Sequence, residues 1–316
     1  MELADKVLRG NIQAAARLIS LIEDDEPRAI EEINRLYPHT GKAHIIGVTG
    51  APGNGKSTLT DNLITAFRKE NMTVGVIAVD PTSAFTGGAI LGDRIRMQKR
   101  SVDKDVFIRS LATRGWTGGL AKATLGTVHI MDALGKDIVL IETVGSGQIE
   151  IDITKAADTT IIVLNPGAGD EIQMMKAGIL EAADIFVINK ADKEGADNLK
   201  TDLETILAMK TSHPGEWQPS IGLTVATSGK GTDELTGEIL RHREFLIASG
   251  ELAKRQKERA KLELLETMES IFKNYIHGID SGDYLDKIVD DLLQGKISPH
   301  SATLEVTRRL AGELCQ

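Results

Sequence analysis

The 316-residue sequence has almost no cysteine and no long apolar run. Cys315 is the single cysteine, so no disulfide can form within the chain, and such usage suits a reducing compartment. No run of apolar residues approaches the roughly 18 that cross a bilayer, and the acidic, amphipathic start at residues 1–5 is unlike a secretory signal. We therefore expect a cytoplasmic protein with no membrane contact.

The chain also has few aromatic residues and no surplus of basic over acidic residues. Aromatic residues make up 3% of the chain, and 46 acidic residues outnumber 37 basic ones, which gives a net charge of −9. Broad nucleic-acid binding needs the opposite sign, and single-strand binding needs aromatic stacking platforms. We therefore expect no nucleic-acid partner. The 31 glycines instead indicate an aliphatic core with many backbone turns.

Short apolar segments separated by stretches of helical periodicity occupy the middle of the chain. They cover residues 45–49, 74–80, 106–110, 138–142, 160–165, 185–189 and 221–225. Near-continuous apolar strands that alternate with helices predict an α/β fold, with a mostly parallel sheet covered by helices on both faces.

Helical spacing without strands marks the two ends of the chain. We expect an N-terminal helical segment over residues 1–43, a central nucleotide-binding domain over 44–248 and a C-terminal helical extension over 249–316. A break is expected near 277–282, and a last helix is expected to begin where Ser298 caps it and Pro299 occupies its first turn.

A glycine-rich loop lies between the first predicted strand and a predicted helix. It reads Gly50-Ala51-Pro52-Gly53-Asn54-Gly55-Lys56-Ser57 and continues into Thr58. This is the phosphate loop in its required context of strand, loop and helix. Loop amides would surround the phosphates, Lys56 would reach the β- and γ-phosphates, and Ser57 would bind Mg²⁺. The fold is therefore predicted to be that of a P-loop NTPase.

A second motif, Asn189-Lys190-Ala191-Asp192, ends the predicted strand 185–189. The Asp192 carboxylate can accept hydrogen bonds from guanine N1–H and the exocyclic amine, whereas adenine would leave the charge unpaired. Lys190 would lie along the ring, so we predict GTP as the substrate. Three residues after the last strand would complete the base pocket, namely Thr227, Ser228 and Gly229.

Carboxylates at strand ends predict the metal site. Glu142 and Asp80 end two strands and Asp93 lies in a glycine-rich stretch, so with Ser57 they would surround Mg²⁺. Helix capping or a solvated loop is the alternative for Asp80 and Asp93.

Two further residues follow Glu142. Gly145 is free to turn its N–H toward the γ-phosphate. Gln148 is the hypothesis for orienting the attacking water, and a surface glutamine is the alternative. The candidate catalytic residues are thus Lys56, Glu142 and Gln148.

Taken in order, these motifs resemble the MeaB/ArgK family of P-loop GTPases, of the SIMIBI class. The resemblance rests on the phosphate loop and on residues 80–83, 86–93, 142–148, 166–171 and 189–192. It implies a homodimer, formed through the helical tail, that hydrolyses GTP to GDP and phosphate with Mg²⁺. It also implies a chaperone that gates adenosylcobalamin delivery to, and protects, a methylmalonyl-CoA mutase-type acyl-CoA mutase.

The resemblance further implies three switch segments, at residues 80–96, 142–152 and 165–176. The third would communicate with the mutase. The switch or partner candidates are Arg96, Asp170, Glu171, Gln173 and Lys176. Adenosylcobalamin would sit on the partner, because this chain has no Asp-x-His-x-x-Gly signature, and an adenosyltransferase is a further expected partner. Two positions depart from the family pattern. Ser146 stands where relatives usually carry valine, a difference expected to affect switch coupling. Residues 109–116 are less close to the family's usual Pro-Ser-rich sequence, which leaves the client mutase open.

Two other functions compete with this interpretation. A metal-insertion GTPase of the same superfamily would carry a His-rich or Cys-containing segment, which seven scattered histidines and Cys315 do not supply. An ArgK-type kinase linked to amino-acid transport would need a base beside an acceptor pocket, for which only Asp61 or Asp93 is a candidate. Release of inorganic phosphate without a phosphorylated acceptor separates the hydrolase from the kinase.

Overall fold

The computed structural model describes residues 2–80, 103–112, 119–143, 153–167, 182–209, 215–279 and 284–314. The chain divides into two compact units, Met1–Lys261 and Leu262–Gln316. The predicted boundary at 248/249 lies in the last turn of the helix that ends at Ser249, and the first unit continues to Lys261.

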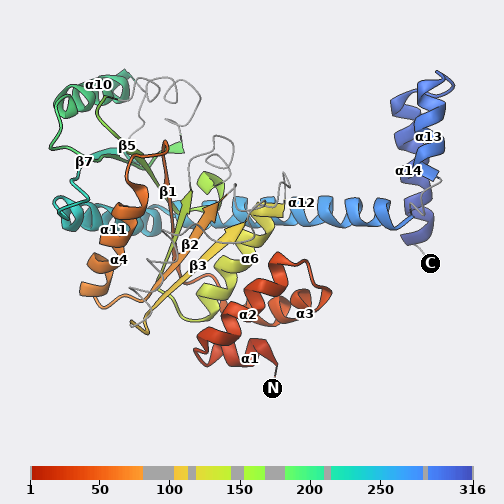
Figure 1. The fold of residues 1–316 in the computed structure, drawn as a ribbon, viewed down its shortest axis with the longest axis horizontal. Coiled ribbons are helices and arrows are strands. Elements are labelled where there is room, and N and C mark those ends of the chain that lie inside the picture. The colour runs from red at the N-terminus through yellow and green to blue at the C-terminus, as the bar shows by residue number, and fades with distance from the viewer. Residues whose placement is uncertain are drawn as a thin grey trace. The chain divides into compact units, whose positions relative to one another are not determined.

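A seven-stranded sheet forms the centre of the first unit (Figure 1). Its strands are β1 (His44–Thr49), β2 (Val74–Asp80), β3 (Val106–Ala112), β4 (Ile138–Thr143), β5 (Thr159–Leu164), β6 (Ile185–Ile188) and β7 (Ser220–Leu223). Their order is β3-β2-β4-β1-β5-β6-β7, and every neighbouring pair is parallel. The predicted α/β fold is confirmed, with each strand within two residues of its expected bounds.

Helices cover both faces of the sheet because its strands are apolar on both sides. Ile46 and Val48 of β1 pack with α4 (Lys56–Lys69) and α11 (Thr232–Ser249), whereas Ile45 belongs to the core formed with α2 (Ile12–Glu23) and α6 (Gly119–Ala133). Residues of β5 and β6 also pack against α10 (Ala196–Met209). Alternate residues along one strand thus enter opposite cores.

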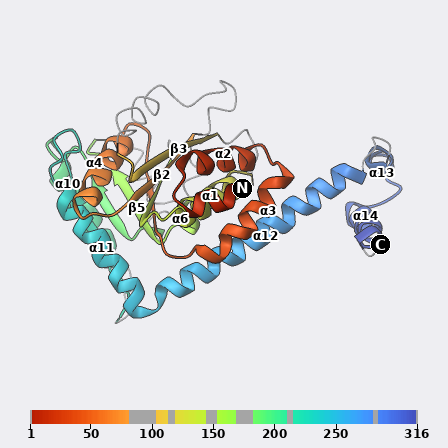
Figure 2. The ribbon, with the colours of Figure 1, turned by 90° about the horizontal axis from the view of Figure 1, so that it is seen from below.

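The N-terminal helices share the core of the sheet. They are α1 (Leu3–Leu8), α2 and α3 (Pro27–Leu36), followed by the short 3-10 helix η1 (Tyr37–His39). Both views place α1 and α2 beside α6 (Figures 1 and 2). The buried carboxylate of Glu32 accepts hydrogen bonds from the amides of Leu3 and Ala4, at 3.1 and 2.7 Å, and so fixes the start of α1.

Two histidines bonded to one threonine are buried at the amino ends of β1 and β5. Thr159 Oγ1 lies 2.7 Å from His44 Nε2 and 2.8 Å from His242 Nδ1, so one hydroxyl joins the first residue of β1 to helix α11. Burial lowers the pKa of His44 to about 3 and that of His242 to about 4. Both rings are therefore neutral at physiological pH, and their hydrogen bonds to Thr159 give them a structural role.

Two arginines fix the start of α12 (Glu251–Ile279) to the same end of the sheet. Arg255 makes a bidentate pair with Asp184, with both distances 2.8 Å. Arg259 donates to Asp158 at 2.8 Å and to the carbonyl of Ala156 at 3.0 Å. These two aspartates precede β6 and β5, so α12 is anchored directly to the amino ends of two neighbouring strands of the sheet.

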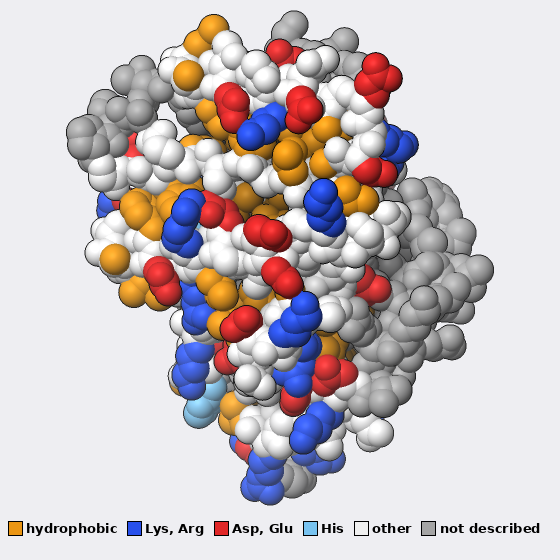
Figure 3. All heavy atoms as spheres, turned by 90° about the vertical axis from the view of Figure 1, so that its left-hand side faces the viewer, with side chains coloured by type: hydrophobic (Ala, Val, Ile, Leu, Met, Phe, Trp, Pro, Cys, Tyr) orange, Lys and Arg blue, Asp and Glu red, His pale blue; other side chains and the backbone are white. Residues whose placement is uncertain are grey.

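The second unit contains the rest of α12, α13 (Tyr284–Leu293) and α14 (Pro299–Leu314). The last helix begins where predicted, and Ser298 Oγ accepts a hydrogen bond from the amide of Ser301 at 3.2 Å. Among the described residues, no helix combines the length and the apolar character needed to cross a bilayer. On the side of the first unit that carries α4, α10 and α11, acidic and basic side chains are interspersed (Figure 3).

Candidate nucleotide site

The phosphate loop follows β1 in a backbone conformation that requires glycine. Gly50 has φ +139°, and a Cβ added there would lie 2.2 Å from the carbonyl oxygen of Val163 in β5. Gly55 has φ +86°, and its Cβ would lie 2.4 Å from Asn189 Nδ2. The loop therefore touches β5 and the guanine motif directly, and a side chain at either position would push it away.

Lys56 is the first residue of α4 and is 6% exposed. Its ammonium donates to the carbonyl of Gly50 at 2.6 Å and to that of Ala51 at 3.0 Å. The charge is thus held inside the loop, where the loop amides and the positive end of α4 also favour an anion.

Ser57 and Glu142 come together at the carboxyl end of the sheet. β1 and β4 are neighbours with Val48 opposite Glu142, and Ser57 Oγ donates to Glu142 Oε1. A hydroxyl and a buried carboxylate are hard oxygen donors of the kind that Mg²⁺ prefers. The described residues contain no group of three or more His, Cys, Asp or Glu that could hold a metal. The contact between Ser57 and Glu142 therefore brings together two of the predicted magnesium ligands.

Of the other predicted metal ligands, Asp80 closes β2 next to β4, which places its backbone at the same edge of the sheet. Asp93 lies outside the described residues. So do Gly145, Gln148, Arg96, Asp170, Glu171, Gln173 and Lys176, whose roles remain predictions.

The guanine motif is hydrogen-bonded to the phosphate loop. Asn189 is buried directly after β6, and its Nδ2 donates to the carbonyl of Asn54 at 2.7 Å. Its Oδ1 accepts from the amide of Ala226 at 3.0 Å and from Thr224 Oγ1 at 3.2 Å. The Asn189 amide therefore joins the phosphate loop to residues 226–229, which we call the base loop.

Lys190 and Asp192 occupy the accessible part of the motif. Lys190 Nζ donates to the carbonyl of Gly53 at 2.8 Å, so the lysine stem lies across the phosphate loop. Asp192 is exposed, as are Thr227 and Ser228 of the base loop. The carboxylate predicted to read guanine is thus open to a base, and the structure brings the phosphate and base motifs to one end of the sheet.

Sequence reasoning missed two side chains that hold these loops. It counted Asn54 only as a member of the phosphate loop, yet its amide donates to the carbonyl of Val163 at 2.8 Å. It did not single out Asn62 of α4, which donates to the carbonyl of Ala226 at 2.7 Å. Neither contact follows from motif spacing, because both partners are backbone atoms far away in the chain.

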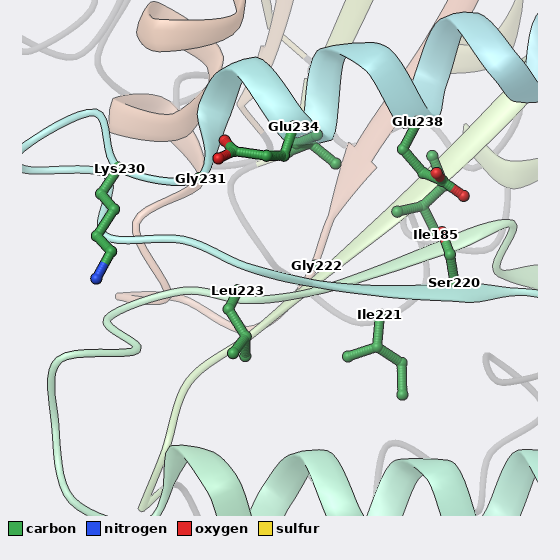
Figure 4. Close-up of a pocket in the computed structure, with 10 residues that line it drawn as sticks. Ile185, Ser220, Ile221, Gly222, Leu223, Lys230, Gly231, Glu234 and Glu238 are labelled. Atoms are coloured by element: carbon green, nitrogen blue, oxygen red, sulfur yellow. The ribbon is translucent and has the colours of Figure 1, made fainter.

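A separate cavity of about 350 Å³ lies between β7 and α11 (Figure 4). It is bounded by Ser220 and Gly222 on the strand and by Leu235, Glu234 and Glu238 on the helix. The two strand residues are small, which leaves the hollow under α11. The cavity contains none of the predicted nucleotide or metal residues.

The fold and the site define a P-loop GTPase: a parallel sheet with the phosphate loop after β1 and the guanine motif after β6. The chain belongs to the MeaB family, because the family model described as Methylmalonyl Co-A mutase-associated GTPase MeaB matches residues 15–278. As a member of this family of GTPases, it hydrolyses GTP to GDP.

Individual relatives agree with this assignment. The chain is 48% identical to a Pyrococcus abyssi protein over 313 residues, covering 98% of this chain and 97% of the relative. It is 31% identical to GTPase ArgK of Escherichia coli, covering 96% and 94% of the two chains. It is also 31% identical to the mitochondrial methylmalonic aciduria type A homolog of Mus musculus, covering 81% and 63%.

Solved structures share the fold. A crystal structure of an LAO/AO transport system kinase matches with a TM-score of 0.72 and 25% identity, covering 98% of this chain and 97% of that one. HypB from Helicobacter pylori, in complex with nickel, matches with a TM-score of 0.50 and 22% identity, covering 68% and 93%. The second likeness shows a common architecture only.

Proposed function

We propose that this GTPase serves an adenosylcobalamin-dependent acyl-CoA mutase of the methylmalonyl-CoA mutase type. In this proposal GTP binding and hydrolysis gate delivery of the cofactor to the mutase and protect the loaded enzyme. Membership of the MeaB family is the observation that carries the proposal, and the similarity to the mouse methylmalonic aciduria type A homolog supports it. The corrinoid would be held by the partner, and an adenosyltransferase would be a second partner.

The chemistry follows from the residues at the loop. Water attacks the γ-phosphate of GTP, and negative charge on the phosphate oxygens is stabilised by the Lys56 ammonium and the loop amides. Ser57 and Glu142 would hold Mg²⁺, with Asp80 and Asp93 as the other predicted ligands. When bound, Mg²⁺ would supply positive charge beside the β- and γ-phosphates.

The client is tested by measuring phosphate release from GTP with and without purified adenosylcobalamin-dependent mutases. The candidates act on methylmalonyl-, isobutyryl-, hydroxyisobutyryl- or ethylmalonyl-CoA. We expect one mutase to accelerate turnover, because a partner can complete a site that hydrolyses slowly alone. Unchanged turnover with all four would contradict the chaperone proposal.

Guanine recognition is tested by Asp192→Asn. The amide replaces one carboxylate oxygen by a donor that faces the guanine donors, so we expect GDP affinity to fall by about a hundredfold or more. Xanthine carries a carbonyl in place of the exocyclic amine, so xanthosine diphosphate should bind the variant better than the wild type. Equal GDP affinity of variant and wild type, measured by calorimetry, would show that Asp192 does not read the base.

A kinase is the second candidate, because the structure of an LAO/AO transport system kinase matches nearly the whole chain. The two functions differ in where the γ-phosphate goes. When the protein is added to a cell extract with γ-labelled GTP, the only label that it adds should be inorganic phosphate if it is only a hydrolase. Label on a protein or an amino acid that depends on Lys56 would favour the kinase.

A further inference from the structure

Three asparagine amides connect the loops of the nucleotide site to the fold. Asn189 joins the phosphate loop to the base loop. Asn54 and Asn62 each donate to one backbone carbonyl, and the two carbonyls belong to different parts of the site. These two contacts suggest two separate tasks.

Asn54 connects the phosphate loop to β5. The residue is 2% exposed, and its Nδ2 donates to the carbonyl of Val163 at 2.8 Å. This is the carbonyl that a Cβ at Gly50 would strike. β5 is the neighbour of β1 in the sheet, with Thr49 opposite Ile162. The Asn54 amide therefore holds the loop at the distance from β5 that Gly50 permits.

Asn62 connects the base loop to α4. It is half-buried, six residues beyond Lys56, and its Nδ2 donates to the carbonyl of Ala226 at 2.7 Å. The amide of the same Ala226 donates to Asn189. Ala226 is thus held from both sides at the start of the base loop, where exposed Thr227 and Ser228 follow.

We propose that Asn54 and Asn62 are positioning residues with separable effects on nucleotide binding. Asn54 holds the phosphate loop in position, and so contributes to the affinity for every nucleotide that carries a phosphate tail. Asn62 holds the base loop in position, and so contributes to the preference for guanine. This inference rests on the guanine assignment made under Proposed function.

The test uses matched leucine substitutions, because leucine keeps the branched shape of asparagine and removes the donor. The variants are Asn54→Leu and Asn62→Leu, with Asn198→Leu on the exposed face of α10 as control. Affinities for GDP and ADP are measured by competition against a fluorescent GDP analogue. Steady-state GTP hydrolysis gives kcat and KM separately, and thermal unfolding checks each fold.

Loss of one buried hydrogen bond corresponds to about a tenfold effect. We expect Asn54→Leu to lower the affinities for GDP and for ADP by the same factor, about tenfold. It should also lower kcat, because Lys56 lies in the displaced loop.

We expect Asn62→Leu to lower the affinity for GDP about tenfold and to leave the affinity for ADP and kcat unchanged. The preference for GDP over ADP therefore falls. Asn62→Gln, which keeps the donor on a half-buried helix face, should restore that preference.

The outcomes separate this inference from the proposed function. A wild-type protein that binds GDP and ADP equally refutes the guanine assignment. If the wild type prefers GDP and Asn62→Leu keeps that preference in full, the inference is wrong and the guanine assignment stands. The same holds if the two leucine variants change the GDP and ADP affinities and kcat identically. If Asn54→Leu does not fold, Asn54→Ser is used, since its hydroxyl is too short to span the same gap, and the same equal loss for GDP and ADP is expected.

Discussion

Gly50 shows how a single residue constrains the site. Its φ of +139° and the 2.2 Å approach to the carbonyl of Val163 leave no room for a side chain. We expect Gly50→Ala to lower GDP affinity by about a hundredfold and to reduce stability by about 1–3 kcal/mol, because the loop must move away from β5. Calorimetric titration and urea unfolding measure the two effects.

Gly10 provides the control for that substitution. It also has a positive φ, +81°, but nothing lies within 4 Å of an added Cβ. Gly10→Ala should therefore show a backbone cost of about 1 kcal/mol and unchanged GDP affinity. If Gly50→Ala binds GDP as well as this control does, the close approach to β5 does not shape the loop.

The buried rings of His44 and His242 make the free energy of unfolding depend on pH. Their pKa values of about 3 and about 4 lie below the ordinary value of 6.5 mainly because they are buried, and nearby Arg255 opposes the charged form of each. Asp184 favours the protonated form of His242, but it is already paired with Arg255. The unfolded chain binds these protons near pH 6.5, whereas the folded chain binds them only near pH 3–4. The stabilisation that comes from keeping these two rings neutral is therefore fully present above pH 6.5, and it is lost as the pH falls toward the folded-state pKa values.

The expected loss is about 1.4 kcal/mol per pH unit for each histidine within that window. Urea unfolding between pH 7 and pH 5 measures it. The variant His44→Gln should flatten this slope by the share of one histidine. A slope that His44→Gln does not alter would show that this ring does not resist protonation in the folded state.

At the scale of elements, the start of α12 depends on buried charge pairs. Asp158 is 1% exposed and Arg259 is 11% exposed, measured on their side chains. Arg259→Met would remove the arginine and leave the buried Asp158 carboxylate with the Ile45 amide as a donor, so we expect the free energy of unfolding to fall by about 3–5 kcal/mol. The exposed pair of Lys254 with Glu251 provides the contrast, since Lys254→Met should cost less than about 1 kcal/mol. Similar losses for the two variants would mean that α12 is not anchored through Asp158.

The strands were predictable and the polar contacts between elements were not. Apolar runs such as 138–142 predict buried parallel strands because a strand covered on both faces has few other compositions. The meeting of Ser57 with Glu142 follows from the same logic, since parallel strands end at one edge. The pairing of Asp184 with Arg255 could not be predicted, because nothing in either local sequence specifies a partner 71 residues away. The same holds for Asn62 and Ala226.

At the scale of the whole molecule, the predicted homodimer depends on an apolar stripe along the second unit's part of α12. Its members are exposed in the single chain, namely Leu264, Leu265, Met268, Ile271 and Phe272. Such side chains are typical of a surface that another protein covers. We propose that a second copy covers it, and we expect sedimentation at micromolar concentration to give a dimer.

A double substitution, Leu265→Glu with Met268→Glu, should then give a monomer with unchanged GDP affinity. Lys257→Glu adds the same charge on the exposed side of the helix within the first unit and should leave the dimer intact. A wild-type protein that sediments as a monomer would contradict the homodimer and leave the stripe without an occupant.

The strand order has a consequence for how the protein is made. β1 is synthesised early, but its neighbours in the sheet are β4 and β5, which leave the ribosome only after a long intervening stretch. The guanine motif and the base loop follow later still. Because non-local pairing must precede the finished site, GTP has no complete pocket to stabilise until most of the first unit has been translated. Until then, the nascent chain depends on its own hydrophobic contacts, or on cellular folding factors, to avoid aggregation.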